Sequence, residues 1–236
     1  IALNGTFTQA DINANLIAFT HNGSETTSGS FGFSVTDGTT SFTGRTFNFA
    51  VTPVNDVPTL ASLSNLTINE DAPERTVSLL GITAGGGESQ PLRVTTTSSN
   101  TDLIPNPTLV YTSAESTGSL LFTPLADANG STVITVTVED GGLDGDLATG
   151  SDNASSSETF SVTVRAVDDA PRATAGSYQP NENELLTVTQ ENGLIQWASD
   201  PDGDALTFSL MAAPAHGQFS LASNGSFVYR PDTNFN

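Results

Sequence analysis

The stretch Phe160-Ser-Val-Thr-Val-Arg-Ala-Val-Asp-Asp-Ala-Pro171 repeats a pattern that occurs earlier as Phe47-Asn-Phe-Ala-Val-Thr-Pro-Val-Asn-Asp-Val-Pro58. In both copies an alternating segment runs into valine, an acidic or amide pair, a small apolar residue and proline. Alternation places Phe160, Val162 and Val164 on one face of a strand, which is typical of a half-buried strand in a β-sandwich. Proline lacks an N–H donor and keeps the preceding residue extended, so it ends the hydrogen-bonded ladder. We therefore interpret each copy as the last strand of a module followed by an extended, acidic hinge.

The two hinges divide the chain into one complete module and two partial ones. We predict a C-terminal part of a module over residues 1–56, a complete module over 57–169 and an N-terminal part of a third over 170–236. Six or seven short strands in about 110 residues favour an immunoglobulin-like sandwich for the middle module. Its candidate strands are 66–68, 76–80, 92–95, 119–123, 132–138 and 159–164, and a polar insert at 141–157 is predicted to be an exposed loop.

The flanking pieces show the same β pattern. A short helical turn is expected between Phe7 and Leu16, and an Asn-Gly turn follows His21. Asn224-Gly225 is a hairpin signal. The remaining candidate strands are 16–20, 31–35, 47–51, 206–210, 219–221 and 227–229. We predict that the whole chain is all-β.

The charge balance disfavours two classes of partner. Six basic residues, all of them arginine, oppose 26 acidic residues and give a net charge of −20. This charge repels nucleic acid and anionic membrane surfaces, whereas bound cations relieve the repulsion between clustered carboxylates. The chain has no cysteine, so disulfides and thiolate metal sites are impossible. No apolar run approaches the roughly 20 residues that span a bilayer.

Several motifs carry a resemblance to known repeats. The segments Phe7-Thr-Gln-Ala-Asp-Ile12 and Phe31-Gly-Phe-Ser-Val-Thr-Asp-Gly38 resemble the second half of a chondroitin-sulfate-proteoglycan repeat, which is a cadherin-like sandwich of animal and large bacterial surface proteins. Asp200-Pro-Asp-Gly-Asp-Ala-Leu-Thr-Phe-Ser-Leu210 and Pro214-Ala-His-Gly-Gln-Phe-Ser-Leu221 resemble bacterial cadherin-like tandem repeats. The resemblance implies tandem immunoglobulin/cadherin-like β-sandwiches arranged as a rod, with neighbouring repeats as partners.

The same resemblance implies calcium at the hinges. Calcium binds six to eight oxygens, which closely spaced acidic and amide side chains supply. In cadherins the ligands come from an early glutamate and the linker of one domain and from an Asp-x-Asp of the next. Carried over to the second hinge, these positions are Glu70, Asp168, Asp169, Asp200 and Asp202, with Asp204 as a further candidate.

The first hinge matches the cadherin pattern less well. Asn55 and Asp56 correspond to the linker, and Asp140 corresponds to a later aspartate of the lower domain. The expected Asp-x-Asp is missing, because residues 82–88 offer only Glu88. We therefore predict weaker calcium binding at this hinge, or none.

Turn chemistry is the alternative explanation for the acidic residues. Aspartate, asparagine and glycine favour turns because they bond their own backbone and tolerate unusual φ angles. This alternative applies to Asp37, which takes the later-aspartate position in the first piece. In the insert, Asp144, Asp146 and Asp152 offer a further ion site, but a solvated acidic loop is the favoured interpretation.

No pattern of catalytic residues supports an enzyme. His21 and His216 each lie at a turn, and no nucleophile motif accompanies either of them. The single tryptophan, Trp197, is interpreted as a core residue. We therefore predict that the chain is not an enzyme.

These features together predict a structural repeat segment of a large extracellular, bacterial, calcium-binding surface protein. It would act as a semi-rigid stalk in cell adhesion, with like chains or a cell-surface ligand as further partners. Two alternatives remain: a self-assembling filament, sheath or surface-layer component, and a spacer in a secreted hydrolase. Fold analogy alone does not separate them.

Overall fold

The computed structural model describes residues 5–20 and 26–235. Contacts between these residues divide the chain into two compact units. The first unit takes its residues from 1–66, 74–123 and 132–162, and the second from 67–73, 124–131 and 163–236. The turn predicted at His21 lies outside the described residues.

The first unit begins with a short helix and a hairpin. Helix α1 (Gln9–Asn13) confirms the predicted helical turn, and Thr8 forms a capping box with Asp11. The Thr8 hydroxyl accepts from the Asp11 N–H, while the Asp11 carboxylate accepts from the Thr8 N–H at 2.7 Å. These two bonds satisfy donors that a helix start otherwise leaves open.

The hairpin pairs β1 (Ser28–Thr36) with β2 (Ser41–Ala50) and carries aromatic rings on one face. Phe31 lies opposite Phe47 in the register, and their ring centroids are 5.5 Å apart. The strand predicted for residues 16–20 is wrong, because these residues form no strand. Phe19 contacts the hairpin through its ring, which stacks on Phe49 with centroids 4.3 Å apart.

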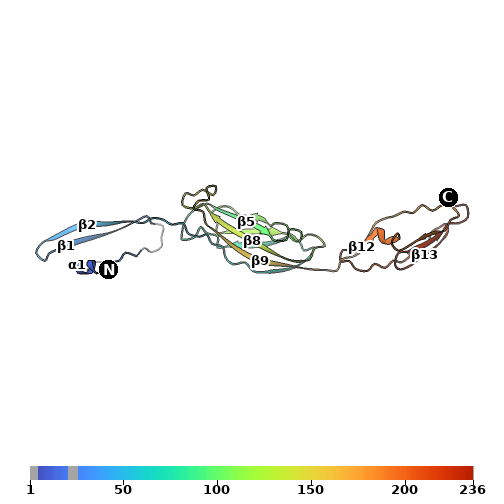
Figure 1. Cartoon of the computed structure of the whole chain (residues 1–236), viewed down its shortest axis with the longest axis horizontal. Helices are drawn as coiled ribbons and strands as arrows, with labels where there is room; N and C mark the ends of the chain where they lie inside the picture. Colours follow the sequence, from blue (N-terminus) through green and yellow to red (C-terminus); the bar gives the residue numbers. More distant parts are fainter. Residues whose placement is uncertain (1–4, 21–25, 236) are drawn as a thin grey trace. The chain divides into compact units, whose positions relative to one another are not determined.

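A seven-stranded sandwich follows, which we call the middle sandwich (Figure 1). One sheet has the order β3-β9-β8-β5 and the other has the order β4-β7-β6. The strands are β3 (Leu66–Asn69), β4 (Arg75–Leu80), β5 (Leu92–Ser98), β6 (Thr108–Val110), β7 (Thr117–Phe122), β8 (Gly130–Asp140) and β9 (Ser155–Arg165). This two-sheet arrangement confirms the predicted all-β immunoglobulin/cadherin-like fold.

The apolar positions of alternating strands form the core of the middle sandwich. Its fully buried side chains are Leu79, Ile82, Ile104, Leu120, Ile134, Val136, Val138, Phe160 and Val162. The six predicted strands of this module are confirmed, and β6 was not predicted because its three residues are too short to show alternation. Strand β9 begins at Ser155, so the insert loop covers residues 141–154.

The second unit contains short strands and one 3₁₀ turn. Strands β13 (Gln218–Leu221) and β14 (Phe227–Arg230) form the hairpin predicted around Asn224-Gly225, and β11 (Leu186–Val188) pairs with the other edge of β14. Strand β10 (Arg172–Ala173) pairs with β12 (Ala198–Ser199), which follows the 3₁₀ helix η1 (Leu194–Trp197). These small elements place the segment after β9 beside the segment that leads to Asp200.

The strand predicted for residues 206–210 is wrong, since no strand forms there. The Phe208 N–H donates to the Ser223 carbonyl at 3.0 Å, and the Phe208 ring packs against Gly225. Leu210 stays 48% exposed. Apolar and polar residues alternate in this segment, but it forms no strand. The packing of the Phe208 ring holds the segment instead of a ladder of backbone hydrogen bonds.

Candidate metal sites

Three aspartates meet in the second unit, and we call them the three-Asp cluster. Asp71, Asp127 and Asp169 each offer a carboxylate oxygen, and these oxygens lie within 4.8 Å of one another. Asp71 lies two residues after the end of β3, Asp127 lies between β7 and β8, and Asp169 follows β9. Asp71 and Asp127 adopt φ angles of 55° and 57°, a left-handed conformation that aspartate tolerates better than most residues. Local turn preference therefore helps to bring the three side chains together.

Hydrogen bonds hold the aspartates of the three-Asp cluster in place. The Asp127 N–H donates to Asp71 Oδ1 at 3.4 Å, and the Asp169 N–H donates to Asp202 Oδ2 at 2.7 Å. Arg172 binds both oxygens of Asp127 at 2.8 Å, the bidentate geometry typical of guanidinium and carboxylate. The contact with Asp127 raises the pKa of Arg172.

Glu70 holds the backbone beside this cluster. It is only 3% exposed, its N–H donates to the Arg165 carbonyl at 2.9 Å, and its Oε1 accepts from the Val167 N–H at 2.6 Å. A buried carboxylate at this position connects the end of β3 to the segment that leaves β9. Glu70 therefore positions the chain that carries Asp169.

The electrostatics around Asp169 are unfavourable in the absence of a cation. Burial, followed by repulsion from Asp71, Asp127, Asp202 and Glu70, raises the pKa of Asp169. Its Oδ2 atom is buried and has no hydrogen-bond partner. A buried acceptor without a donor is costly, and a hard divalent cation with oxygen preference satisfies such a set of carboxylates. The donor chemistry therefore fits calcium.

The remaining predicted ligands of the second hinge differ in their hydrogen bonds and in their exposure. Asp202 joins the three-Asp cluster through its bond to the Asp169 amide. Asp200 Oδ1 accepts from the N–H groups of Asp202 at 3.0 Å and Asp204 at 3.3 Å, which is the turn chemistry considered as the alternative. Asp168 and Asp204 are exposed. Metal binding by Asp168, Asp200 and Asp204 stays a prediction.

Two members of the three-Asp cluster were not predicted from the sequence. Asp71 is the direct neighbour of Glu70, so an acidic pair after a strand was the available signal. Asp127 lies in Ala-Asp-Ala-Asn-Gly, which resembles an ordinary turn and gives no sign of its distant partners. Its proximity to Asp169 depends on the pairing of strands, which the sequence spacing does not reveal.

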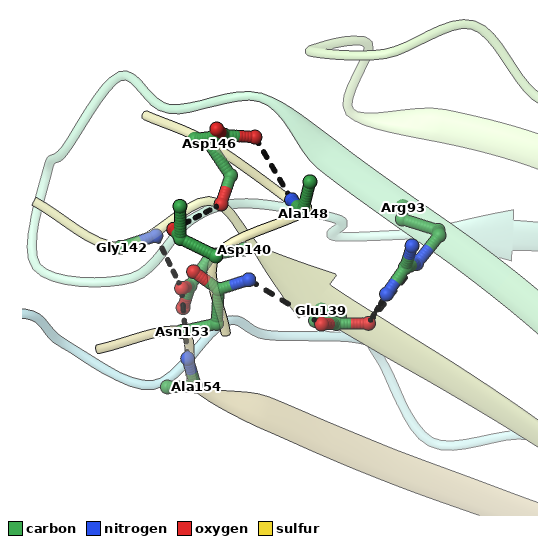
Figure 2. A network of polar contacts seen from close by, with 9 residues as sticks. Arg93, Glu139, Asp140, Gly142, Asp146, Ala148, Asn153 and Ala154 are labelled. Carbon is green, nitrogen blue, oxygen red and sulfur yellow. Dashed lines mark hydrogen bonds and ion pairs between the residues drawn. The ribbon is translucent and has the colours of Figure 1, made fainter. Parts of the chain in front are cut away.

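A second polar network surrounds Asp140 in the first unit (Figure 2). Asp140 ends β8 and is completely buried. Its Oδ1 accepts from the N–H groups of Gly142 at 3.0 Å and Ala154 at 2.9 Å. Beside it, Glu139 accepts from Arg93 and from Asn153 Nδ2 at 3.4 Å (Figure 2). The network therefore joins both ends of the insert loop to β8.

The linker residues of the first hinge belong to the same network. Asn55 Nδ2 donates to Asp140 Oδ1 at 3.1 Å, and Asn55 Oδ1 accepts from Gln90 Nε2 at 2.7 Å. The Asp56 N–H donates to Glu88 Oε2 at 3.3 Å. Asn55 thus contacts Asp140, and Asp56 follows it in the chain; metal binding by Asn55, Asp56 and Asp140 stays a prediction.

Asp37 takes part in turn chemistry. Its Oδ1 accepts from the N–H groups of Thr39 at 2.8 Å and Thr40 at 2.7 Å, in the turn between β1 and β2. These backbone donors, with Thr40 the largest cause, lower the pKa of Asp37 from its ordinary value of 3.8. The carboxylate therefore stabilises the hairpin turn.

The lowered pKa of Asp37 predicts acid sensitivity of the hairpin. Its stabilising contribution is complete above the ordinary pKa of 3.8 and is lost as the pH falls through the lowered value of the folded state. We expect the amide resonances of Thr39 and Thr40 to follow this titration in NMR spectra, and Asp37→Asn to abolish the effect. A carboxyl group at Asp37 that titrates at or above 3.8 would contradict the prediction.

His216 and Trp197 both pack against aromatic rings. The His216 ring stacks on Phe235 with centroids 4.2 Å apart, and its Nδ1 lies 3.9 Å from Asp232 Oδ2. Trp197 is half-buried and packs edge-on against Tyr178, at 5.1 Å between centroids. Among the described residues, no helix is long and apolar enough to cross a membrane.

Comparison with known families identifies two segments. Residues 168–236 match the model of the bacterial cadherin-like domain, and residues 3–51 match a model described as cadherin-like. These segments are cadherin-like repeats. The likeness of the first cadherin-like repeat to chondroitin-sulfate-proteoglycan repeats stays a prediction. No curated protein matches the sequence of the chain.

Solved structures with partial similarity include an S-layer protein and a cadherin. Domains 4 and 5 of the S-layer protein SbsC show 16% identity and a TM-score of 0.34, with 58% of this chain and 57% of that chain covered. EC22–24 of mouse cadherin-23 shows 16% identity and a TM-score of 0.41, with 85% of this chain and 63% of that chain covered. The chain therefore spans less than two thirds of either structure.

Proposed function

We propose that the chain is a structural segment of a large extracellular surface protein, in which calcium bound by the three-Asp cluster fixes the segment that follows β9. The observation that carries this proposal is Asp169 Oδ2, a buried oxygen without a partner among three converging carboxylates. Asp202 and Glu70 lie next to these carboxylates and would complete the acidic set. The cadherin-like matches support the extracellular repeat context.

The proposed role of calcium follows from charge and connectivity. Without a cation, the carboxylates repel one another; burial first, and this repulsion second, raise the pKa of Asp169. A divalent ion neutralises two charges and accepts lone pairs from several side chains at once. Because Asp71, Asp127 and Asp169 belong to three separate segments, one ion would restrain all three segments. A restrained connection between repeats is what a semi-rigid stalk for adhesion requires.

Calcium titration of the chain tests this proposal. After chelator treatment, we expect added Ca²⁺ to raise the thermal unfolding midpoint of the second unit and to give a saturable binding heat. Asp71→Asn and Asp127→Asn each remove one charge with little change in shape, and each should weaken binding by about tenfold or more, which corresponds to about 1.4 kcal/mol. Two variants are used because Asp127 also forms two hydrogen bonds with Arg172, whereas the interaction between Asp71 and Arg172 is coulombic.

Asp102→Asn provides the matched control. Asp102 is an exposed aspartate of the middle sandwich outside the three-Asp cluster. This variant should bind calcium like the unmodified chain. Equal affinity in Asp71→Asn, Asp127→Asn and Asp102→Asn would show that the three-Asp cluster does not hold the ion.

A further inference from the structure

Arg172 supplies a positive charge to the three-Asp cluster. Its Nη1 lies 2.8 Å from Asp127 Oδ2, and its Nη2 lies 2.8 Å from Asp127 Oδ1. Whichever oxygen Asp127 offers to an ion, a guanidinium nitrogen therefore lies beside it. Among residues 5–20 and 26–235, no other cationic side chain forms an ion pair with a carboxylate of this cluster.

The guanidinium group is also close enough to respond to the other two carboxylates. The hydrogen bonding to Asp127 is the largest cause of the raised pKa of Arg172, the charge of Asp127 is the next, and the charges of Asp169 and Asp71 raise this pKa further. The three oxygens of the cluster lie within 4.8 Å of one another, so an ion held by them lies close to the guanidinium group. Two cations beside one carboxylate repel each other. Calcium and Arg172 therefore compete for the same negative charge.

The ion pair can open without loss of the cluster. The side chain of Arg172 is 62% exposed, whereas that of Asp127 is 26% exposed. A guanidinium group on the surface exchanges its carboxylate for water at low cost, because exposed ion pairs contribute little to stability. Asp127 is the more enclosed partner, and its N–H still donates to Asp71 Oδ1 at 3.4 Å. When Arg172 leaves, Asp127 therefore stays beside Asp71.

The backbone of Arg172 is held independently of its side chain. Arg172 belongs to β10, which pairs with β12, and the Thr174 N–H donates to the Trp197 carbonyl at 2.8 Å. A Cβ atom added to Gly176 would clash with the Trp197 ring, so the same segment packs against the indole. The amide of Thr174 therefore reports whether β10 keeps its place when the side chain of Arg172 is changed.

We propose, on the basis of the calcium function proposed above, that Arg172 is a built-in competitor of calcium at the three-Asp cluster. In the calcium-free chain, its guanidinium group neutralises Asp127 and limits the repulsion between the carboxylates. When calcium binds, the ion replaces the guanidinium group at Asp127, and the side chain of Arg172 moves into water. Arg172 thereby lowers the calcium affinity and sets the concentration at which the cluster fills.

Two substitutions of Arg172 separate its charge from its shape. Arg172→Gln removes the positive charge, whereas Arg172→Lys keeps the charge but lacks the planar fork that binds both carboxylate oxygens. Arg230→Gln is the matched control, because Arg230 is an exposed arginine of the same unit that forms no ion pair with the cluster. All variants are made in the full chain and treated with chelator, and the Thr174 amide resonance is used to check that β10 is intact.

Calcium chloride is then titrated into each chain by calorimetry at constant ionic strength. We expect Arg172→Gln to bind calcium about tenfold more tightly than the unmodified chain. Arg172→Lys and Arg230→Gln should bind like the unmodified chain, because both leave the charge beside Asp127 in place. A side chain that only holds β10 in position would give the opposite sign, since its removal would loosen the cluster and weaken binding.

The side-chain N–H resonances of Arg172 give a second measurement that needs no variant. In the unmodified chain they should lose protection from exchange as calcium binds, while those of Arg93, which pairs with Glu139, stay unchanged. Full protection of Arg172 in the calcium-loaded chain would overturn the displacement.

The calorimetric outcomes separate the role of Arg172 from the calcium site itself. Equal or weaker binding by Arg172→Gln, beside binding by the unmodified chain that Asp71→Asn weakens, would overturn the competition and leave the three-Asp cluster as the calcium site. Binding by Arg172→Gln without binding by the unmodified chain would support the competition. If neither chain binds calcium, both the competition and the calcium site are wrong.

Discussion

Replacing Leu79 by alanine is expected to lower the free energy of unfolding of the middle sandwich by about 2–5 kcal/mol. Leu79 is completely buried in β4 and packs in the core with the other apolar side chains of the two sheets. The loss has two parts, the transfer energy of the removed methyl groups and the cavity that remains because the packed core relaxes only partly. Denaturant titration followed by amide exchange in β7, the strand paired with β4, measures the change.

The next residue of the same strand is the control. Leu80 is 54% exposed, because successive side chains in a strand point to opposite faces. Leu80→Ala should change the free energy of unfolding by less than about 1 kcal/mol, since surface substitutions have small effects. Similar losses for Leu79→Ala and Leu80→Ala would mean that β4 does not bury the face assigned to it.

Substitution of Gly85 by alanine is expected to detach the first linker from the middle sandwich. Gly85 has a φ angle of 94°, and an added Cβ would lie 2.3 Å from the Val57 carbonyl oxygen. The backbone conformation alone costs about 1–3 kcal/mol for a residue with a side chain, and the clash forces the linker to move. We expect a total loss that exceeds the backbone cost by about 1–3 kcal/mol, the range for overpacking.

Gly87→Ala separates the two contributions to this loss. Gly87 has a similar φ angle of 90°, but an added Cβ would meet nothing within 4 Å. The difference in unfolding free energy between Gly85→Ala and Gly87→Ala therefore measures the contact with the linker. If the two variants are equally stable, the close approach of Val57 to Gly85 is not present in solution.

Alternation made the strands of the middle sandwich predictable. Phe160, Val162 and Val164 are buried as their spacing requires, because a strand with one buried face must repeat its apolar residues every second position. The same signal was misleading at Leu206, Phe208 and Leu210, where ring packing against Gly225 replaces strand pairing. Periodicity reports which side chains share a face, and it does not report whether a partner strand is available.

The candidate sites were only partly predictable. The repeated hinge pattern identified Asp56 and Asp169 by their common place before a proline. Asp127 could not be predicted, because Asp71 and Asp169, which lie beside it in space, are 56 and 42 residues away in the sequence. Sequence spacing carries no information on such contacts. Asp152 belongs to an insert that was expected to be a solvated loop. Asp152 is half-buried with a buried Oδ1, whereas Asp144 is exposed.

The packing of Trp197 on Tyr178 has an optical consequence. The chain contains one tryptophan, and this residue belongs to the second unit. At wavelengths that excite tryptophan but not tyrosine, the first unit is therefore silent, and all emission reports on the surroundings of η1. Changes in emission wavelength and quenching thus follow the unfolding of the second unit in the intact chain, without any label and without a contribution from the middle sandwich core.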